Sequence, residues 1–291
     1  MQRRVGLVLA VPLLVVVSAL PAAAAPTFGR PSVAALQVGL RDRGLYKGTI
    51  DGIIGPQTTR AVRKLQRRAK IGVDGVAGPK TVRALGRFSR HRLGSRPLRY
   101  GATGWDVAAL EFELATHGFP SGAFDGRFGP HVDDALRRFQ SWAGLPRNGV
   151  TGASTLAALR RPPPRAVLPL AWPVTKVVLG NRFGPRGDGF HAGIDLKAPV
   201  GTPVYAARAG KVVYANWAQG WGYLVVLDHG HGERTFYAYL SKIAVRLGVW
   251  VGKGVQLGSV GKSGAEEAGG PHLHFEVRVR GAVVNPLPAL P

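Results

Sequence analysis

The sequence predicts a multidomain chain with α and β parts, in which two small three-helix bundles precede an antiparallel β-rich domain. Three observations lead to this prediction: an internal repeat in the first half, a proline-rich break after it, and short Val-, Tyr- and Phe-rich runs between glycine turns in the last third. Because 45% of the 291 residues are hydrophobic, the chain can build real cores, which excludes a mainly disordered protein.

Composition also limits the chemistry. The chain contains no cysteine, so disulfides, thiolate zinc sites and cysteine nucleophiles are excluded, and a metal would need His, Asp or Glu as ligands. The net charge of +23 favours a polyanionic partner, which could be nucleic acid, an anionic membrane or an anionic cell wall.

Residues 1–25 have the pattern of a secretory signal peptide. Arg3 and Arg4 precede an uncharged apolar stretch, and alanines at 22–25 supply the cleavage site, which we place after Ala24. The alternative is an uncleaved membrane anchor, since the apolar stretch is nearly long enough to cross a bilayer. Cleavage predicts a secreted or cell-wall-associated, extracytoplasmic protein with no stable membrane span. Export argues against nucleic acid as the polyanion.

The first half contains a duplicated module. Shifted by 74 positions, residues 36–85 align without a gap on 110–159, with 18 of 50 positions identical. Each copy predicts a helix with leucines at helical spacing, a Gly-rich turn, a second helix (about 57–68 in the first copy), another Gly turn and a short last helix. We place the first module at 33–88 and the second module at 105–161.

The repeated residues resemble the peptidoglycan-binding type 1 domain, and this resemblance implies binding to the bacterial cell wall. The motif in the first copy consists of Leu36-Gln37, Asp51-Gly52, Gly55-Pro56-Gln57-Thr58 and Leu65-Gln66. The second copy departs from it, with Glu111 in place of the Gln and Val132 in place of the Thr. The alternative is that the motif residues only form the turns and caps of a small bundle.

Charge is distributed unevenly between the copies. Residues 26–99 carry 17 basic and 3 acidic residues, whereas 100–161 carry six of each. The basic run from Arg63 to Lys70 is either a solvated helix face or a surface that attracts anionic wall polymers. The proline-rich segment 162–171 predicts an extended, semi-rigid linker that separates the modules from the C-terminal part of the chain.

Residues 172–291 form the predicted β-rich domain, and two histidine groups in it stand out. On a strand, His272, His274 and Glu276 would share one face while the alternate apolar residues face the core. His191 and Asp195 would lie about 13 Å apart in an extended strand, too far to share a metal, but Gly193 allows a bend. Two His and one carboxylate make a tetrahedral zinc site with one position open for water.

The segment 172–288 resembles the lysostaphin-type, LytM-like zinc metalloendopeptidases that cut peptidoglycan cross-bridges. The motifs that carry the resemblance are Arg182-Phe183-Gly184-Pro185-Arg186, His191 to Asp195, Gly201-Thr202-Pro203-Val204, Gly222-Tyr223 leading to His229-Gly230, and Gly270 to Glu276. The resemblance implies a metallopeptidase domain with Zn²⁺ as cofactor, held by His191, Asp195 and His274, and with His272 as a catalytic residue. It also implies that bacterial peptidoglycan is the partner and substrate.

One position departs from that family. Its members usually carry a second catalytic His where this chain has Tyr239, in the segment Tyr237 to Leu240. Strand parity predicts Tyr239 on the cleft side together with Thr235 and Tyr237, where its phenol could donate a hydrogen bond to a developing oxyanion. Two hypotheses therefore stand: a zinc endopeptidase in which Tyr239 is catalytic, or a weak or inactive wall-binding or regulatory protein.

Overall fold

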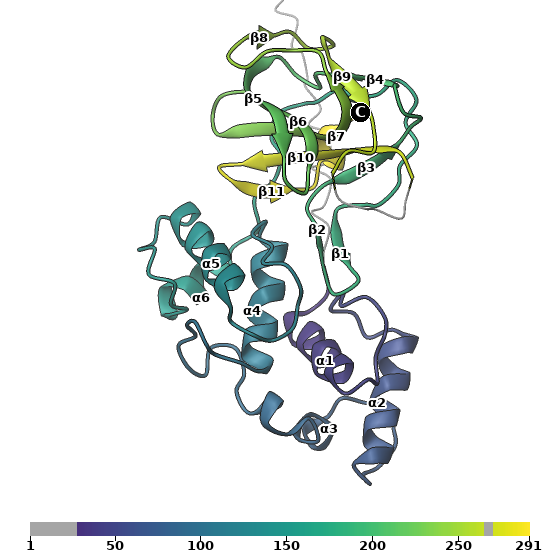
Figure 1. The fold of residues 1–291 in the computed structure, drawn as a ribbon. Helices are drawn as coiled ribbons and strands as arrows, with labels where there is room; N and C mark the ends of the chain where they lie inside the picture. Colours follow the sequence, from purple (N-terminus) through teal and green to yellow (C-terminus); the bar gives the residue numbers. More distant parts are fainter. Residues whose placement is uncertain (1–27, 265–269) are drawn as a thin grey trace, which may run out of the picture.

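The computed structural model describes residues 28–264 and 270–291 (Figure 1). The predicted signal peptide, 1–25, lies outside the described residues. Within the described ranges, no helix has the length and apolar character needed to cross a membrane. The fold class is as predicted: helices fill the N-terminal part, and an antiparallel β-rich domain comes after them.

The helical part repeats in structure as it does in sequence. Its elements are α1 (Pro31–Asp42), α2 (Pro56–Arg68), α3 (Pro79–Arg83), the 3₁₀ helix η1 (Gly86–Ser89), α4 (Trp105–Thr116), α5 (Pro130–Trp142) and α6 (Ala153–Leu159). A glycine in extended conformation followed by proline begins α2, α3 and α5. Proline suits this position because its missing N–H would have no partner in the first turn and its φ is already helical.

A glutamine clamp ties a helix to the turn after it. In the first module, the Gln37 side chain donates to Asp51 Oδ1 (2.7 Å) and accepts the N–H of Gly52 (2.9 Å). The same pair of bonds recurs twice more in the helical part, at Gln66 with Asp74 and Gly75, and at Gln140 with Asn148 and Gly149. In the fourth clamp Glu111 stands in for Gln and accepts the N–H of Gly126 at 2.9 Å. These motif residues therefore build the turns.

The two modules share a buried cluster that lies between α1 and α4, and the second module has a further cluster of its own. Residues of α1 such as Leu36 and Leu40 pack in the same buried cluster as Trp105 and Phe112 of α4. Each module was expected to be a small bundle of its own, marginal in stability. The joint core removes that difficulty, because α1 and α4 bury each other's apolar faces.

The β-rich domain is built on a nine-stranded sheet whose pairings are all antiparallel. Its strands are β3 (Ile194–Lys197), β4 (Pro203–Tyr205), β5 (Gly210–Ala218), β6 (Gly222–Asp228), β7 (Glu233–Ile243), β8 (Trp250–Val251), β9 (Gln256–Val260), β10 (His272–Val279) and β11 (Ala282–Val284). A separate two-stranded hairpin pairs β1 (Gly184–Arg186) with β2 (Gly189–His191). The 3₁₀ helix η2 (Leu287–Ala289) comes after β11.

The core of this domain lies on one face of β10. Leu273, Phe275 and Val277 are buried in the apolar cluster, as strand alternation predicts. The opposite parity sends His272, His274 and Glu276 to the other face, where they are buried among polar groups.

The sequence predicted that segment 162–171 would separate the helical part from the β-rich domain. In the structure the two parts are in contact. The end of the segment is bound to the β-rich domain: the Leu170 N–H donates to Ala289 O at 2.8 Å, and the Leu170 side chain is buried in the domain core. The helical part also contacts the β-rich domain directly, since the Val283 N–H donates to Gly118 O at 2.9 Å. An extended proline-rich chain can lie along a surface as well as span a gap, and only tertiary contacts decide which.

Candidate metal and active site

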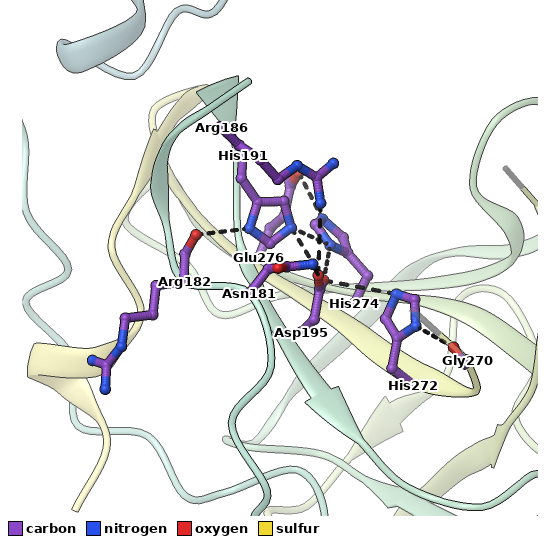
Figure 2. A network of polar contacts seen from close by, with 9 residues as sticks. All are labelled: Asn181, Arg182, Arg186, His191, Asp195, Gly270, His272, His274 and Glu276. Atoms are coloured by element: carbon purple, nitrogen blue, oxygen red, sulfur yellow. Dashed lines mark hydrogen bonds and ion pairs between the residues drawn. The ribbon is translucent and has the colours of Figure 1, made fainter. Parts of the chain in front are cut away.

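Three side chains predicted as metal ligands converge at the start of β10 (Figure 2). His191 Nε2 lies 3.1 Å from Asp195 Oδ1, and His274 Nδ1 lies 2.9 Å from the same oxygen. The two histidine nitrogens are 3.1 Å apart. All three residues are buried. The fold thus brings His274 to His191 and Asp195, which lie far from it in the sequence, and the three were predicted to act as one group.

Two features of the backbone produce this convergence. The β3–β10 register places Asp195 directly opposite His274. Between β2 and β3, Ala192 and Gly193 turn the chain, so that His191 folds back toward Asp195. The turn passes so close to β10 that a Cβ on Gly193 would lie 2.4 Å from Phe275 O. Glycine is required there because any side chain would collide with the neighbouring backbone.

The three donors fit a single metal ion. Their ligand atoms all lie within 4.8 Å of one another. Around a tetrahedral zinc with bonds near 2.0 Å, ligand atoms are about 3.3 Å apart, close to the separations seen here. Two imidazoles and one carboxylate are typical zinc donors, and three protein ligands leave a fourth position for water or substrate.

Hydrogen bonds set the tautomers that such a site needs. His191 Nδ1 donates to the carbonyl of Arg182 at 2.9 Å, which leaves Nε2 as the atom that faces the group. His274 Nε2 contacts the Glu276 carboxylate at 3.3 Å, which directs Nδ1 toward Asp195. Carboxylate and carbonyl partners of this kind orient the ring and raise the basicity of a metal-binding histidine.

The group is strongly coupled electrostatically. Burial alone would raise the pKa of Asp195, but hydrogen bonds from His191 and His274 outweigh it and hold that pKa well below its usual range. Burial would lower the pKa of His274, but its bonds to Asp195 and Glu276 raise it to about 9. The negative charge of Asp195, which favours a proton on His274 Nδ1, would also favour a metal cation bound between these two residues.

Three neighbouring contacts were not found by sequence reasoning. Asn181 Nδ2 donates to Asp195 Oδ2 at 2.9 Å, and Arg186 Nη1 lies 3.9 Å from the same oxygen. Arg278 Nε donates to Glu276 Oε2 at 2.8 Å, so the carboxylate that orients His274 is itself held. Arg186 lies in a motif that the resemblance singled out, but nothing in the sequence marks Asn181.

His272 lies beside the three donors. Its Nε2 is 3.8 Å from Asp195 Oδ1, and its Nδ1 contacts the Gly270 carbonyl at 2.8 Å. A carbonyl oxygen only accepts, so in this contact Nδ1 carries the proton and Nε2 is the basic nitrogen. That nitrogen faces the metal group.

Tyr239 also lies at the site, on the side that was predicted. The reason given for that prediction, regular strand alternation, does not hold in this part of β7. Its ring centroid lies 5.2 Å from that of His272 and 5.6 Å from that of His274. Tyr237, expected on the same side, instead lies in the core, where its hydroxyl accepts the N–H of Ala207. The prediction for Tyr237 was wrong because Tyr239 has a φ of +61°, which interrupts the alternation of β7.

His229 and His117 lie outside this group, and each contacts a backbone carbonyl oxygen. His229 contacts Ala209 O and Thr235 Oγ1, both at 2.8 Å. His117 is buried, with ring nitrogens 2.8 Å from Glu113 O and 3.0 Å from Arg161 O. The joint between the second module and the proline-rich segment covers it, which the sequence does not show.

Comparison with known proteins identifies domains in both parts of the chain. Residues 189–286 match peptidase family M23, and residues 29–85 and 103–159 each match a putative peptidoglycan binding domain. The chain therefore carries a peptidase family M23 domain behind two peptidoglycan-binding domains. The resemblances noted in the sequence are confirmed.

Curated relatives match part of this chain, and their names describe different roles. The murein hydrolase activator EnvC of Escherichia coli is 39% identical over 121 residues, which are 41% of this chain and 28% of EnvC. The peptidoglycan DD-endopeptidase ShyA of Vibrio cholerae is 42% identical over 99 residues, 34% of this chain and 23% of ShyA. The chain thus spans less than a third of the length of either. The solved catalytic domain of lysostaphin from Staphylococcus simulans is 33% identical, with a TM-score of 0.36 over 38% of this chain and 90% of that one.

Proposed function

We propose that this protein is an exported, zinc-dependent endopeptidase that hydrolyses peptide cross-links of bacterial peptidoglycan. The observation that carries the proposal is the buried triangle of His191 Nε2, Asp195 Oδ1 and His274 Nδ1, in which the other ring nitrogen of each histidine contacts a carbonyl or carboxylate oxygen. The two peptidoglycan-binding domains supply the means to hold the enzyme on its substrate.

Each residue has a specific task in this mechanism. His191, Asp195 and His274 would hold Zn²⁺, which when bound acidifies water and polarises a carbonyl. His272 Nε2 accepts the proton of the attacking water, since its Nδ1 is committed to Gly270 O. Tyr239, whose ring lies against both His272 and His274, donates a hydrogen bond to the oxygen that gains negative charge.

Tyr239 also favours a second candidate, a wall-binding or regulatory protein with little or no peptidase activity. A phenol has a pKa near 10 and is a poor base at neutral pH. General acid–base assistance contributes about 10²- to 10⁴-fold, so its loss would slow hydrolysis. The relative EnvC is named a murein hydrolase activator, which is a regulatory role. The intact ligand triangle is the reason to prefer the enzyme.

Cross-link hydrolysis separates the two candidates. Residues 26–291 loaded with zinc are incubated with purified peptidoglycan, and newly released amino groups are counted. We expect release from the natural sequence and none from His274→Ala, with Tyr239→His releasing more than either. If the natural sequence releases nothing while Tyr239→His does, the site is assembled but inactive, and the regulatory candidate replaces the enzyme.

Wall attachment is tested separately from hydrolysis. We propose that anionic wall polymers contribute to attachment through the basic face of α2, which bears Arg60, Arg63, Lys64, Arg67 and Arg68. Cosedimentation with peptidoglycan sacculi that carry or lack anionic polymer should show stronger, salt-sensitive binding in the first case. Equal binding to both preparations would remove the polymers from the proposal and leave peptidoglycan alone.

A further inference from the structure

The hairpin β1–β2 carries the metal ligand His191 but is not part of the main sheet. It forms a two-stranded sheet of its own, with Gly184 paired to His191 and Arg186 to Gly189. A two-stranded hairpin is at best marginally stable in water and needs packing from elsewhere. Figure 1 shows β1 and β2 extending away from the sheet domain to the helical part, beside α1.

The tip of the hairpin is bonded to both modules. Gly187 O accepts the N–H of Ile50, from the first module, at 2.8 Å. The next residue, Asp188, accepts the N–H of Phe124, from the second module, at 2.5 Å through its backbone oxygen. Its carboxylate also pairs with Arg41 Nη1 at 3.2 Å. The tip is therefore held between the two modules.

An aromatic cluster fixes the stem of the hairpin. The rings of Phe183 and Phe190 lie 5.0 Å apart, and Phe28, which precedes α1, lies 6.1 Å from the first and 5.6 Å from the second. Phe190 and Phe28 both pack against the core that the modules share. Such contacts contribute area burial together with about 0.5–1.5 kcal/mol per aromatic pair.

The anchored residues are adjacent to the metal group. Phe190 immediately precedes His191 in β2, and Arg186 of β1 brings its guanidinium to 3.9 Å from Asp195. A metal site tolerates displacement of a ligand by only about 0.5 Å. Movement of the hairpin relative to the main sheet would separate His191 from Asp195 and His274, which belong to that sheet.

We propose that the two wall-binding modules complete the metal site by holding the β1–β2 hairpin, with Phe28 and Phe190 as positioning residues for His191. The modules then act on the active site itself, in addition to any role in attachment. This inference rests on the metal site of the proposed function and not on hydrolysis.

The test is metal affinity in the full chain, measured by zinc competition with a chromophoric chelator. Phe28→Ala changes a residue outside the β-rich domain, yet we expect it to weaken zinc binding on the order of ten-fold, as loss of a supporting contact does. Phe190→Ala should weaken zinc binding to the same extent, whereas Phe28→Tyr, which keeps an aromatic ring, should bind zinc as tightly as the natural chain. The matched control is Phe88→Ala, which packs on the same shared core but contacts Trp105 and not the hairpin.

The outcomes separate this inference from the proposed function. Zinc binding by the natural chain with a selective loss in Phe28→Ala supports the inference. Equal affinity in Phe28→Ala and the natural chain, or an equal loss in Phe88→Ala, overturns it while leaving the metal site in place. Absence of zinc binding in the natural chain overturns the metal site and the inference together. Circular dichroism of each variant establishes that the fold is retained.

Discussion

Glu111 is the one residue that departs from the Gln pattern of the four clamps, and the change gives the clamp residue a carboxyl group with a raised pKa. The other three clamps in the helical part use Gln, whose amide donates to an Asp or Asn and accepts a glycine N–H. Glu111 accepts the Gly126 N–H in the same way and is buried as the three Gln residues are, but it is a carboxyl group and faces Asp125. Burial raises its pKa to about 9, and the negative charge of Asp125 acts in the same direction, against the lowering effect of the Gly126 N–H.

This raised pKa predicts a pH-dependent stability. Because the folded pKa lies above the ordinary value of 4.5, the stabilising contribution is complete below that value and declines as the pH rises toward 9. Between pH 5 and pH 8 this ionisation should lower the free energy of unfolding of the natural chain by roughly 4 kcal/mol. Glu111→Gln has no proton to lose, so the variant should not show this decline. Urea unfolding at the two pH values measures this difference.

The reciprocal control is Gln140→Glu, which places a carboxyl in an otherwise identical clamp. We expect this variant to lose stability more steeply with pH than the natural chain, since Asn148 cannot ionise but burial still penalises the carboxylate. Parallel pH profiles for the natural chain and Glu111→Gln would show that Glu111 ionises without cost in the folded protein.

At the scale of elements, the bend between β2 and β3 decides whether the ligands meet. A Cβ at Gly193 would lie 2.4 Å from Phe275 O and 2.9 Å from Glu276 Cγ. Both atoms belong to β10, the strand that carries His274. The turn can therefore accept a side chain only by moving away from the strand with which it builds the site.

Gly193→Ala is expected to lower zinc affinity at least about ten-fold by displacing His191 from Asp195. Competition with the same chromophoric chelator measures it. Gly252→Ala serves as the matched control, because the nearest atom to a Cβ there is Val255 Cγ2 at 3.9 Å. Unchanged affinity in Gly193→Ala would mean that the bend adjusts without cost to the site.

At the scale of the whole molecule, the buried cluster that α1 and α4 share joins the two modules, while the second module keeps a further cluster of its own. Phe112 of α4 is completely buried and packs with residues of α1 as well as with Phe124, whose ring lies 5.6 Å away. Phe139 of α5 is equally buried but belongs to a different cluster, which does not include α1. Substitution of Phe112 therefore tests the packing between the modules, and substitution of Phe139 tests the packing within the second module.

Phe112→Ala should destabilise both modules together by about 3–5 kcal/mol, the usual cost of removing a buried aromatic ring. Hydrogen exchange should show lost protection in α1 and α4 alike. Phe139→Ala should lower protection in α5 more than in α1. If α1 keeps its protection in Phe112→Ala, the modules are independent domains that merely touch.

Several parts of the fold and site can be predicted from local sequence. The repeat, the helix starts at Gly-Pro, and the period-two pattern of β10 are local features, and each predicts a structure that the chain adopts. The resemblance carried by the motifs at His191 to Asp195 and Gly270 to Glu276 implies the residues of the metal group, and the geometry brings them together. Strand parity failed at Tyr237, because it assumes unbroken extended backbone, and the positive φ at Tyr239 breaks that assumption.

The sequence by itself determined the elements and the residue types of the site, since turn chemistry, hydrophobic period and ligand identity are properties of short segments. Tertiary structure alone decided that α1 and α4 share a core, that Asn181 supports Asp195, and that the hairpin bearing His191 is held between the two modules. These contacts join residues far apart in the chain. They depend on how finished elements pack against one another, and no periodicity or local motif encodes that.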